Sequence, residues 1–346
     1  TFNTAIVEGD VGNAGEGIKL IRYWGQAGYK DNWSGDLRVQ NTTQGQFATI
    51  TFGPVSSKFQ ASGPNWVNTK GDGATLTSAV TGPGRTYTYT GGNGTVIEYK
   101  DLPAITGGFP GQTLWLQVGL DNCNAATADD CALPTKITNP DGSQYKLTWD
   151  VVSECLNDVD ENLNLLDTTT CYVNYRLKDV RSKSSYAMKI KYQSNVWSGG
   201  TFNTNLAWLK RSNVKFFDLG QFYCDPEALD CDSVPAINSV TYSTPTSNTT
   251  NVTDERNGTW VLTTNALGQL SGIRRPGATS DTTTVSYTNG KVSSITNNGE
   301  TKTYSWGTSG GNTTVTTTTS AGETEHWISD PATLAVVEWR DGCLGA

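Results

Sequence analysis

Apolar residues in the last third of the chain recur behind turn residues at a regular interval. In the stretch NALGQLSGIRRPG, Asn265 to Gly277, Leu270 and Ile273 follow the turn glycine Gly268 within a segment rich in Thr, Ser, Asn and Gly. Comparable anchors stand at positions 268, 290, 311 and 332, which gives steps of 22, 21 and 21 residues. A period of this length predicts stacked supersecondary units, each of which buries its apolar side against its neighbours.

The turn chemistry predicts that each unit is a β-hairpin. Asn289-Gly290 is a strong hairpin signal, because both residue types adopt positive φ readily. With a two-residue turn there, Tyr287 would face Val292 across the ladder as a favourable aromatic–branched pair. The spacing of three between Val292 and Ile295 does not fit an uninterrupted strand, so we expect a β-bulge or a change of face.

The predicted fold is therefore all-β, with consecutive hairpins of about 21 residues in a spiralling or stacked antiparallel sheet. The copy at Gly311 is degenerate, and the last copy begins at Ala332. Each copy contributes an aromatic residue, a turn residue and aliphatic residues to the expected repeat core. This core comprises Trp260, Gly268, Leu270, Ile273, Tyr287, Gly290, Val292, Ile295, Trp306, Trp327, Leu334 and Val337.

Cysteine spacing adds a second constraint. Six of the seven cysteines are close neighbours in sequence, and proximity alone predicts three local disulfides. Zinc is the weaker alternative, because no Cys-x2-Cys pair exists and His326 is the one histidine. Disulfides imply an extracellular or cell-surface location, with the periplasm as the alternative compartment. The predicted pairs are Cys123–Cys131, Cys155–Cys171 and Cys224–Cys231, and Cys343 is left over.

The ordered set of motifs resembles the Rhs/YD-repeat proteins, which include bacterial Rhs and toxin-complex shells and the teneurins. The resemblance is carried by the aromatic residue, the turn glycine, the Gly-x-Leu-x-x-Ile core and the 21-residue step. Earlier segments fit the same pattern: LIRYWGQAGYKDNWSGDLRV (Leu20 to Val39), RTYTYTGGNGTVIEY (Arg85 to Tyr99), NPDGSQYKLTW (Asn139 to Trp149) and NYRLKDV (Asn174 to Val180). The Tyr-Asp dipeptide of that family and its self-cleavage motif are missing from this sequence.

This resemblance implies three regions and a structural role. Residues 1–105 would form an N-terminal β region, 106–235 a disulfide-containing β region with loose repeats, and 236–346 the YD-like hairpin repeats. We expect a non-enzymatic β-wall segment of a shell or fibre. Its partners would be other subunits or further segments of the same protein, through open sheet edges. The chain, which starts at Thr1, is expected to be a piece of something larger.

Candidate chemical sites are sparse, and no cofactor is expected. Asp158, Asp160 and Asn162 alternate as at the start of a calcium loop, but Leu163 stands where that loop needs glycine. A stapled, solvated loop between Cys155 and Cys171 is the more direct interpretation. His326 has no second histidine to complete a metal site or a triad, so we expect it to be a solvent-facing strand residue.

Charge and hydropathy exclude two classes of partner, and two functional alternatives stay open. The formal charge of −8 argues against nucleic acid, and no apolar stretch of 18 residues or more predicts membrane insertion. The basic stretch from Arg176 to Lys191 alternates with apolar residues, as on the wet face of a strand. The first alternative is an adhesin or carbohydrate-binding module with exposed aromatics and glycans as partners. The second is a polysaccharide-acting enzyme with a carboxylate pair.

Overall fold

The computed structural model describes residues 5–12, 17–25, 28–53, 55–81, 84–101, 112–118, 121–122, 130–159, 165–193, 211–220, 231, 234–330 and 336–342. Within these ranges only the backbone is described for residues 5, 24–25, 28–30, 81, 112–118, 121–122, 130, 151–159, 165–174 and 336–342.

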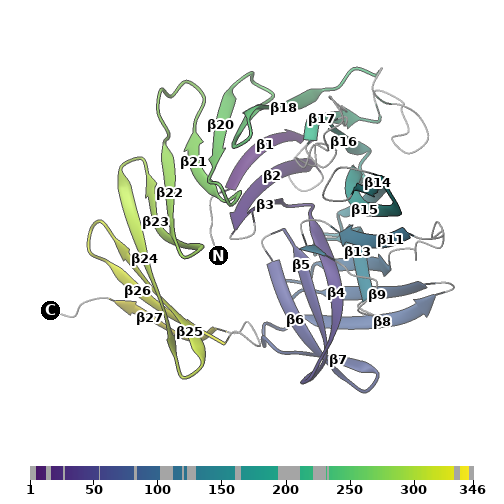
Figure 1. The fold of residues 1–346 in the computed structure, drawn as a ribbon, viewed down its shortest axis with the longest axis horizontal. Helices are drawn as coiled ribbons and strands as arrows, with labels where there is room; N and C mark the ends of the chain where they lie inside the picture. Colours follow the sequence, from purple (N-terminus) through teal and green to yellow (C-terminus); the bar gives the residue numbers. More distant parts are fainter. Residues whose placement is uncertain are drawn as a thin grey trace.

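The described residues form β-strands and contain no α-helix, which confirms the all-β prediction (Figure 1). The first half of the chain contains β1 (Ala5–Val11), β2 (Ile18–Gly25), β3 (Gly28–Asp31), β4 (Gly35–Thr42), β5 (Gly45–Phe52), β6 (Val55–Ser62), β7 (Asn65–Asn68), β8 (Thr75–Thr81), β9 (Gly84–Thr90), β10 (Val96–Asp101), β11 (Gln112–Val118), β12 (Asp121–Asn122), β13 (Asp130–Thr138), β14 (Gln144–Val159) and β15 (Leu165–Ser182). The second half contains β16 (Tyr186–Tyr192), β17 (Arg211–Asp218), β18 (Asn238–Thr246), β19 (Thr249–Thr253), β20 (Thr259–Thr264), β21 (Leu270–Arg274), β22 (Thr283–Thr288), β23 (Lys291–Asn297), β24 (Glu300–Ser309), β25 (Asn312–Thr319), β26 (Thr324–Ser329) and β27 (Val336–Gly342).

These strands belong to two sheets. β1, β2 and β3 form a small antiparallel sheet of their own, and β4 to β27 belong to one large sheet. From β13 to β27 the described hairpins follow one another as antiparallel neighbours, and β11 adds to β15 in parallel. β13 pairs with β10, with β14 and with β4, so the sheet closes on itself in the N-terminal half.

The main core lies on the inner face of the large sheet. Strand alternation places Leu37 and Val39 of β4, and Met188 and Ile190 of β16, on this buried face. The small β1–β3 sheet lies within the curve of the large sheet (Figure 1) and buries Ile18 and Leu20 in the same core. The lysines that alternate with Met188 and Ile190 are partly or fully exposed, as expected for the wet side of the strand.

The Asn289-Gly290 hairpin forms as the sequence predicts. Asn289 and Gly290 have φ values of 51° and 74°, and Tyr287 is in register with Val292. Ser286 pairs with Ser294, so Ser293 is an extra residue and forms a β-bulge. This bulge explains the spacing of three between the apolar positions of the copy.

A second turn type recurs in five hairpins. The N–H of the first residue donates to the carbonyl four residues later, and the N–H of the fourth residue donates back to the first carbonyl, at 2.8–3.0 Å. The fourth position has positive φ, which favours glycine or asparagine. This geometry confirms the turns expected around Gly94, Gly142 and Gly268. The five turns begin at Gly91, Asn139, Asp254, Asn265 and Thr319.

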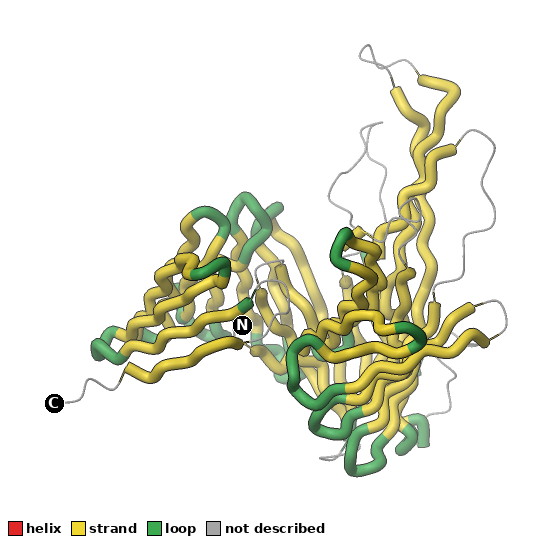
Figure 2. Tube along the Cα trace, turned by 90° about the horizontal axis from the view of Figure 1, so that it is seen from below, coloured by secondary structure: helices red, strands yellow, loops and turns green. Residues whose placement is uncertain are grey.

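The C-terminal strands differ from the rest because their apolar side chains are not buried. Figure 1 shows β24 to β27, here called the C-terminal lobe, next to β22 and β23 at one end of the large sheet, and in Figure 2 the strands on this side lead to the C-terminus. Within β24 to β26, Thr317 is the one side chain that is buried, and Trp327 is 38% exposed.

Two of the predicted disulfide cysteines have described side chains. Cys131 and Cys231 are buried, and both are disulfide-bonded. Their bonding partners are not among the described side chains, so the predicted pairings stay predictions; Cys123, Cys224 and Cys343 lie outside the described residues.

The segment between Cys155 and Cys171 is different from the expected loop. Cys155–Val159 and Leu165–Cys171 continue β14 and β15 as paired strands, and Cys155 stands opposite Cys171 in register. The expected stapled, solvated loop was wrong in its extent, because residues 155–159 and 165–171 extend the hairpin as paired strands. Within the described part of the chain, no helix has the length and apolar composition that crossing a membrane requires.

Candidate functional site

The most regular chemistry in the molecule joins a β-bulge to an aromatic side chain of the next strand. In β23, Ser294 is the last residue in register with β24, where it pairs with Thr303. Two residues earlier, the carbonyl of Val292 accepts a hydrogen bond from the indole Nε1–H of Trp306 at 2.6 Å. Trp306 lies three residues beyond Thr303. We call this arrangement an aromatic-capped bulge.

The same arrangement occurs at three other places in the described chain. Tyr287 Oη donates to the Leu270 carbonyl at 2.7 Å, and Tyr192 Oη donates to the Leu177 carbonyl at 2.8 Å. Trp149 Nε1 donates to the Pro134 carbonyl at 2.7 Å. In each case the residue after the accepting carbonyl is the extra residue of a bulge; these residues are Thr135, Lys178, Ser271 and Ser293.

The position of the aromatic residue follows one rule in all four copies. In each copy, the strand after the bulge forms its last in-register pair with the residue that lies two positions after the accepting carbonyl. The aromatic donor lies three residues further along that following strand. The last pairs are Lys136–Lys146, Asp179–Lys189, Gly272–Thr284 and Ser294–Thr303.

A bulge explains what such a donor can do, although the bulge at Ser212 of β17 has Thr244 at the corresponding position. The extra residue interrupts the ladder, and it leaves a carbonyl without a backbone N–H partner at the edge that receives the next strand. Buried backbone carbonyls are nearly always paired, and the polar tip of a Tyr or Trp supplies the missing donor while its ring packs. Pro134 fits this position because only its carbonyl takes part.

Sequence reasoning found part of this series. It placed Leu270, Tyr287, Val292 and Trp306 in the repeat core, and it identified the Arg176-Leu177 copy. It treated the aromatic residues as packing groups and missed their polar role, and it missed Pro134 altogether. The detectable signal is a Tyr or Trp that lies 14 to 17 residues after an aliphatic residue or proline.

The remaining predicted repeat-core residues have different positions in the different copies of the repeat. Gly268, Leu270, Ile273 and Val292 adopt the predicted turn and core positions, whereas Ile295 and Trp260 are partly buried. The degenerate copy at Gly311 has an in-register β24–β25 hairpin without a bulge. Leu334 lies outside the described residues. In β27 the extra residue is Val337, since Ile328 pairs with Glu338 and Ser329 with Val336, so Val336 aligns with Leu270 and Val292.

Removing one cap should cost stability without removing packing. We expect Tyr287→Phe to lower the free energy of unfolding by about 1 to 3 kcal/mol, because the Leu270 carbonyl loses its donor. Tyr304→Phe is the matched control, since Tyr304 of β24 is also partly buried and caps no bulge among the described residues; its cost should stay below about 0.5 kcal/mol. Urea unfolding measures both, and equal losses would contradict the cap.

A buried charge cluster attaches the small sheet to the large one. Glu8 is the extra residue of a bulge in β1, and its carboxylate accepts hydrogen bonds from Arg22 Nε and from the hydroxyl of Tyr242 in β18. All three side chains are buried. Burial and the neighbouring Glu8 carboxylate raise the pKa of Tyr242 well above its ordinary value, so the hydroxyl keeps its proton and donates.

Asp31 and Arg211 form the second buried ion pair between the sheets. Asp31 Oδ1 accepts the backbone N–H of Trp33 at 2.8 Å, and Oδ2 is bonded to Arg211 of β17. Burial disfavours the charged carboxylate, but the Arg211 guanidinium and these hydrogen bonds outweigh it and lower the pKa of Asp31. Gly9 allows the close approach of the sheets, because a Cβ there would lie 2.7 Å from the ring of Phe216.

The lowered pKa of Asp31 predicts a pH dependence of stability. Its contribution is complete above about pH 4, the ordinary Asp pKa, and is lost as the pH falls through the lower folded-state value. We therefore expect Asp31→Asn to be destabilising at pH 7 and its difference from the parent chain to shrink towards pH 2. Urea unfolding at both pH values checks this. A difference that stays constant would contradict the account.

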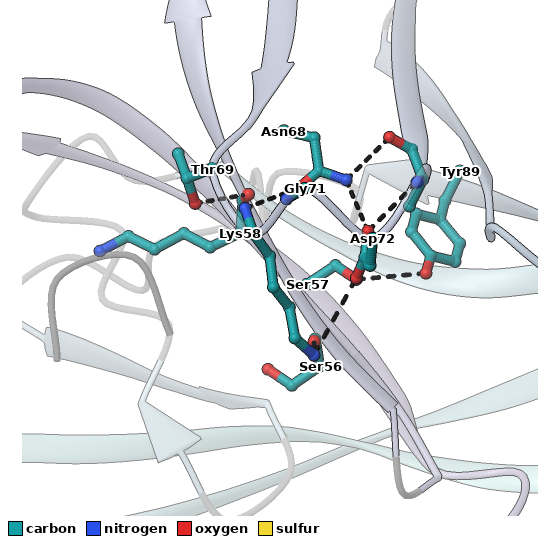
Figure 3. A network of polar contacts seen from close by, with 10 residues as sticks. Ser56, Ser57, Lys58, Asn68, Thr69, Gly71, Asp72 and Tyr89 are labelled. Carbon is teal, nitrogen blue, oxygen red and sulfur yellow. Dashed lines mark hydrogen bonds and ion pairs between the residues drawn. The ribbon is translucent and has the colours of Figure 1, made fainter. Parts of the chain in front are cut away.

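A third polar network fixes the connection from β7 to β8 (Figure 3). Asn68 Nδ2 donates to Asp72 Oδ1 at 2.6 Å, and Asp72 Oδ2 accepts from Ser57 Oγ at 3.4 Å. Ser57 Oγ also lies 3.2 Å from the hydroxyl of Tyr89. Burial opposes ionisation of Asp72, but the hydrogen bonds led by Asn68 lower its pKa. Since these bonds join the turn residues Asn68 and Asp72 to Ser57 of β6, which in turn contacts Tyr89 of β9, the network holds the loop against its neighbouring strands.

The predicted metal and histidine positions are not brought into a site. Only the backbone of Asp158 is described, in β14, and Asp160 and Asn162 lie outside the described residues. No group of three or more His, Cys, Asp or Glu side chains gathers to hold a metal ion in the described part. His326 is partly buried in β26, and its Nδ1 lies 2.9 Å from Thr316 Oγ1 of the neighbouring strand.

No family model matches the chain, and no curated protein matches it. Among solved structures it is similar to TcdB2-TccC3, with 8% identity and a TM-score of 0.38 over 94% of this chain and 19% of that one. It thus spans about a fifth of that longer chain. It is also similar to a porin-like protein from Bacteroides uniformis, with 10% identity and a TM-score of 0.23 over 86% and 98% of the two chains. Similarity at these values does not establish a family or a function.

Proposed function

We propose that this chain is a non-catalytic structural segment that builds a β-wall, as part of a secreted or surface protein of the Rhs/YD-repeat type. The aromatic-capped bulges carry the proposal, because at four places along the sheet they bond a strand to the strand that follows it. Four of the aromatic residues that an adhesin could expose donate these bonds instead: Trp149, Tyr192, Tyr287 and Trp306.

The proposed partners are further segments or other subunits that join through open sheet edges. The uncovered apolar side chains of β24 to β26 support this proposal, because β-sheet edges and faces of this kind template pairing. Contacts that repeat without closing give a head-to-tail fibre, and a closed ring or shell results if the rotation closes.

Sedimentation combined with hydrogen exchange tests the structural role. We expect the 346-residue chain to associate with rising concentration, and the amides of β26 and β27 to exchange fast in its monomer. A stable monomer whose β26 and β27 amides exchange slowly would show that the C-terminal lobe needs no cover, and it would overturn the proposal.

An extracellular or cell-surface location and three local disulfides complete the proposal. The disulfide bonding of Cys131 and Cys231 supports it, as does the register that places Cys155 opposite Cys171. Peptide mapping without reduction should recover the pairs 123–131, 155–171 and 224–231. Recovery of a disulfide between cysteines of two different predicted pairs would contradict the proposal.

A carbohydrate-binding role is the second candidate, favoured by one observation. Trp327 is the one aromatic side chain among the exposed large hydrophobic residues of the described chain. Glu325 lies two residues away on the same side of β26, where it bonds to Lys302 at 2.7 Å and to Thr317 at 3.1 Å. Binding on a glycan array that is lost in Trp327→Ala would favour this role over the structural one.

A further inference from the structure

One face of β24 to β26 carries a row of aromatic side chains that is only partly covered. These strands are neighbours in the C-terminal lobe (Figure 1), and their register places Trp306, Val315 and Trp327 in one row across them. Trp327 is 38% exposed, and the ring of Trp306 has the Lys291 ammonium 5.2 Å from its centre. We call this side of the three strands the tryptophan face.

An ion pair crosses the tryptophan face beside the aromatic row. Lys302 Nζ of β24 lies 2.7 Å from Glu325 Oε2 of β26, and the same oxygen accepts a hydrogen bond from Thr317 Oγ1 of β25 at 3.1 Å. The pair therefore spans β25 and covers Thr317, which is buried. The side chains of Lys302 and Glu325 are 37% and 35% exposed, so a ligand on this face can reach both.

Three polar groups of this face have hydrogen-bonding capacity that no described neighbour uses. Glu325 Oε1 has no partner in the described part of the chain, and the Lys302 ammonium uses one of its three N–H donors there. The hydroxyl of Tyr304, which is in register with Thr317, has no partner among the described residues either. The hydrogen bond from Lys302 lowers the pKa of Glu325, and burial raises the pKa of Tyr304. The face thus offers an ionised acceptor, a cationic donor and a protonated hydroxyl.

A neutral sugar matches this combination of groups. The C–H face of a pyranose ring stacks on an aromatic ring, and each hydroxyl at its rim both donates and accepts hydrogen bonds. Neighbouring hydroxyls can therefore donate to Glu325 Oε1 and accept from Lys302 at the same time. Because the two charges cancel, the ion pair gives the face no net charge with which to attract an ionic ligand.

We propose that the tryptophan face binds a neutral polysaccharide. Trp327 is the stacking platform, and Lys302, Glu325 and Tyr304 bind the sugar hydroxyls. Trp306 and Trp327 are two strands apart, about 10 Å at the backbone, so the ligand is a chain of several sugars and not a monosaccharide. This inference rests on the carbohydrate-binding role given above as the second candidate function, and it names the ligand class and the contacts.

The probe is a β-linked hexasaccharide of glucose, titrated into the full 346-residue chain by calorimetry. The matching hexasaccharide of glucuronic acid has the same rings and linkages and differs by one carboxylate on each ring. Ser305→Ala is the matched control variant, because Ser305 is exposed between Tyr304 and Trp306 and strand alternation places it on the opposite face of β24.

We expect the glucose hexasaccharide to bind, and Trp327→Ala to weaken its binding about tenfold or more, because the stacking platform is lost. Tyr304→Phe keeps the ring and removes the hydroxyl, so it should weaken binding about five- to tenfold, the equivalent of one net hydrogen bond. Ser305→Ala should leave the affinity unchanged. The glucuronic acid hexasaccharide should bind more weakly than the glucose one, because its carboxylates meet Glu325 Oε1.

The other outcomes overturn the inference. Binding of the glucose hexasaccharide that neither Trp327→Ala nor Tyr304→Phe weakens would refute the tryptophan face as its site. Tighter binding of the glucuronic acid hexasaccharide would refute a neutral ligand. If Trp327→Ala does not fold, Tyr304→Phe against Ser305→Ala decides the site. Absence of binding by either hexasaccharide would refute the inference and leave the structural role intact, because sedimentation of the same chain tests that role independently.

Discussion

Replacing Glu8 with alanine should lower the free energy of unfolding by about 3 to 5 kcal/mol, the cost of breaking a buried ion pair from one side. Glu8 and Arg22 are 2% and 3% exposed, so the guanidinium would stay buried without its main counter-charge. Tyr242 would lose the acceptor of its hydroxyl as well. Chemical unfolding followed by tryptophan fluorescence measures the loss.

Two further variants test whether the loss comes from breaking a buried ion pair or from losing any charged contact. Lys302→Ala removes a similar contact to Glu325 whose side chains are 37% and 35% exposed, and its cost should be at most about 1 kcal/mol. The double change Glu8→Met with Arg22→Met should recover most of the loss, because no unpaired charge remains. A Glu8→Ala cost no greater than that of Lys302→Ala would show that the cluster does not hold the small sheet.

Truncating Leu270 to alanine is expected to cost about 2 to 5 kcal/mol, since the side chain is 1% exposed and leaves a cavity in the main core. Leu267 provides the matched control three residues earlier, in the same turn. It is 75% exposed, so Leu267→Ala should change the free energy of unfolding by less than about 0.5 kcal/mol.

The comparison tests whether the core reaches the repeats. Leu270 and Ile273 belong to the same buried cluster as Leu20 of the small sheet and Met188 of β16. If the repeats were an independent unit, Leu270→Ala would unfold them in a separate transition and leave the rest unchanged. We expect a single transition shifted to lower denaturant for both fluorescence and circular dichroism.

Local chemistry allowed the hairpins to be predicted. Asn289-Gly290 and Gly268 require positive φ, and this requirement is visible in sequence; the Tyr287–Val292 pair followed from it. The spacing of three between Val292 and Ile295 indicated a bulge or a change of face, and the structure has the bulge, at Ser293. The aromatic caps were not predicted, because the partner carbonyl depends on where the next strand leaves register. That position is a property of two strands together, and alternation along one strand does not reveal it.

Contacts between segments far apart in the chain could not be predicted from the sequence either. Glu8 meets Tyr242 and Asp31 meets Arg211 across separations of 234 and 180 residues, and no local pattern marks these charges as buried. The same limit applies to the return of β13 to β4, which closes the sheet. The hairpin at Cys155 and Cys171 was interpreted as a loop because its acidic and Asn-rich composition is typical of solvated turns.

Exchange of the indole N–H protons tests the capped-bulge account most directly. In a nitrogen-15 NMR spectrum, assigned by single Trp→Phe variants, the account predicts that the Nε1 protons of Trp149 and Trp306 exchange slowly, because each is bonded to a bulge carbonyl. The Nε1 proton of Trp66, whose exposed contact to Ser78 is 3.5 Å long, should exchange fast. Exchange of Trp149 and Trp306 as fast as that of Trp66 would contradict the account.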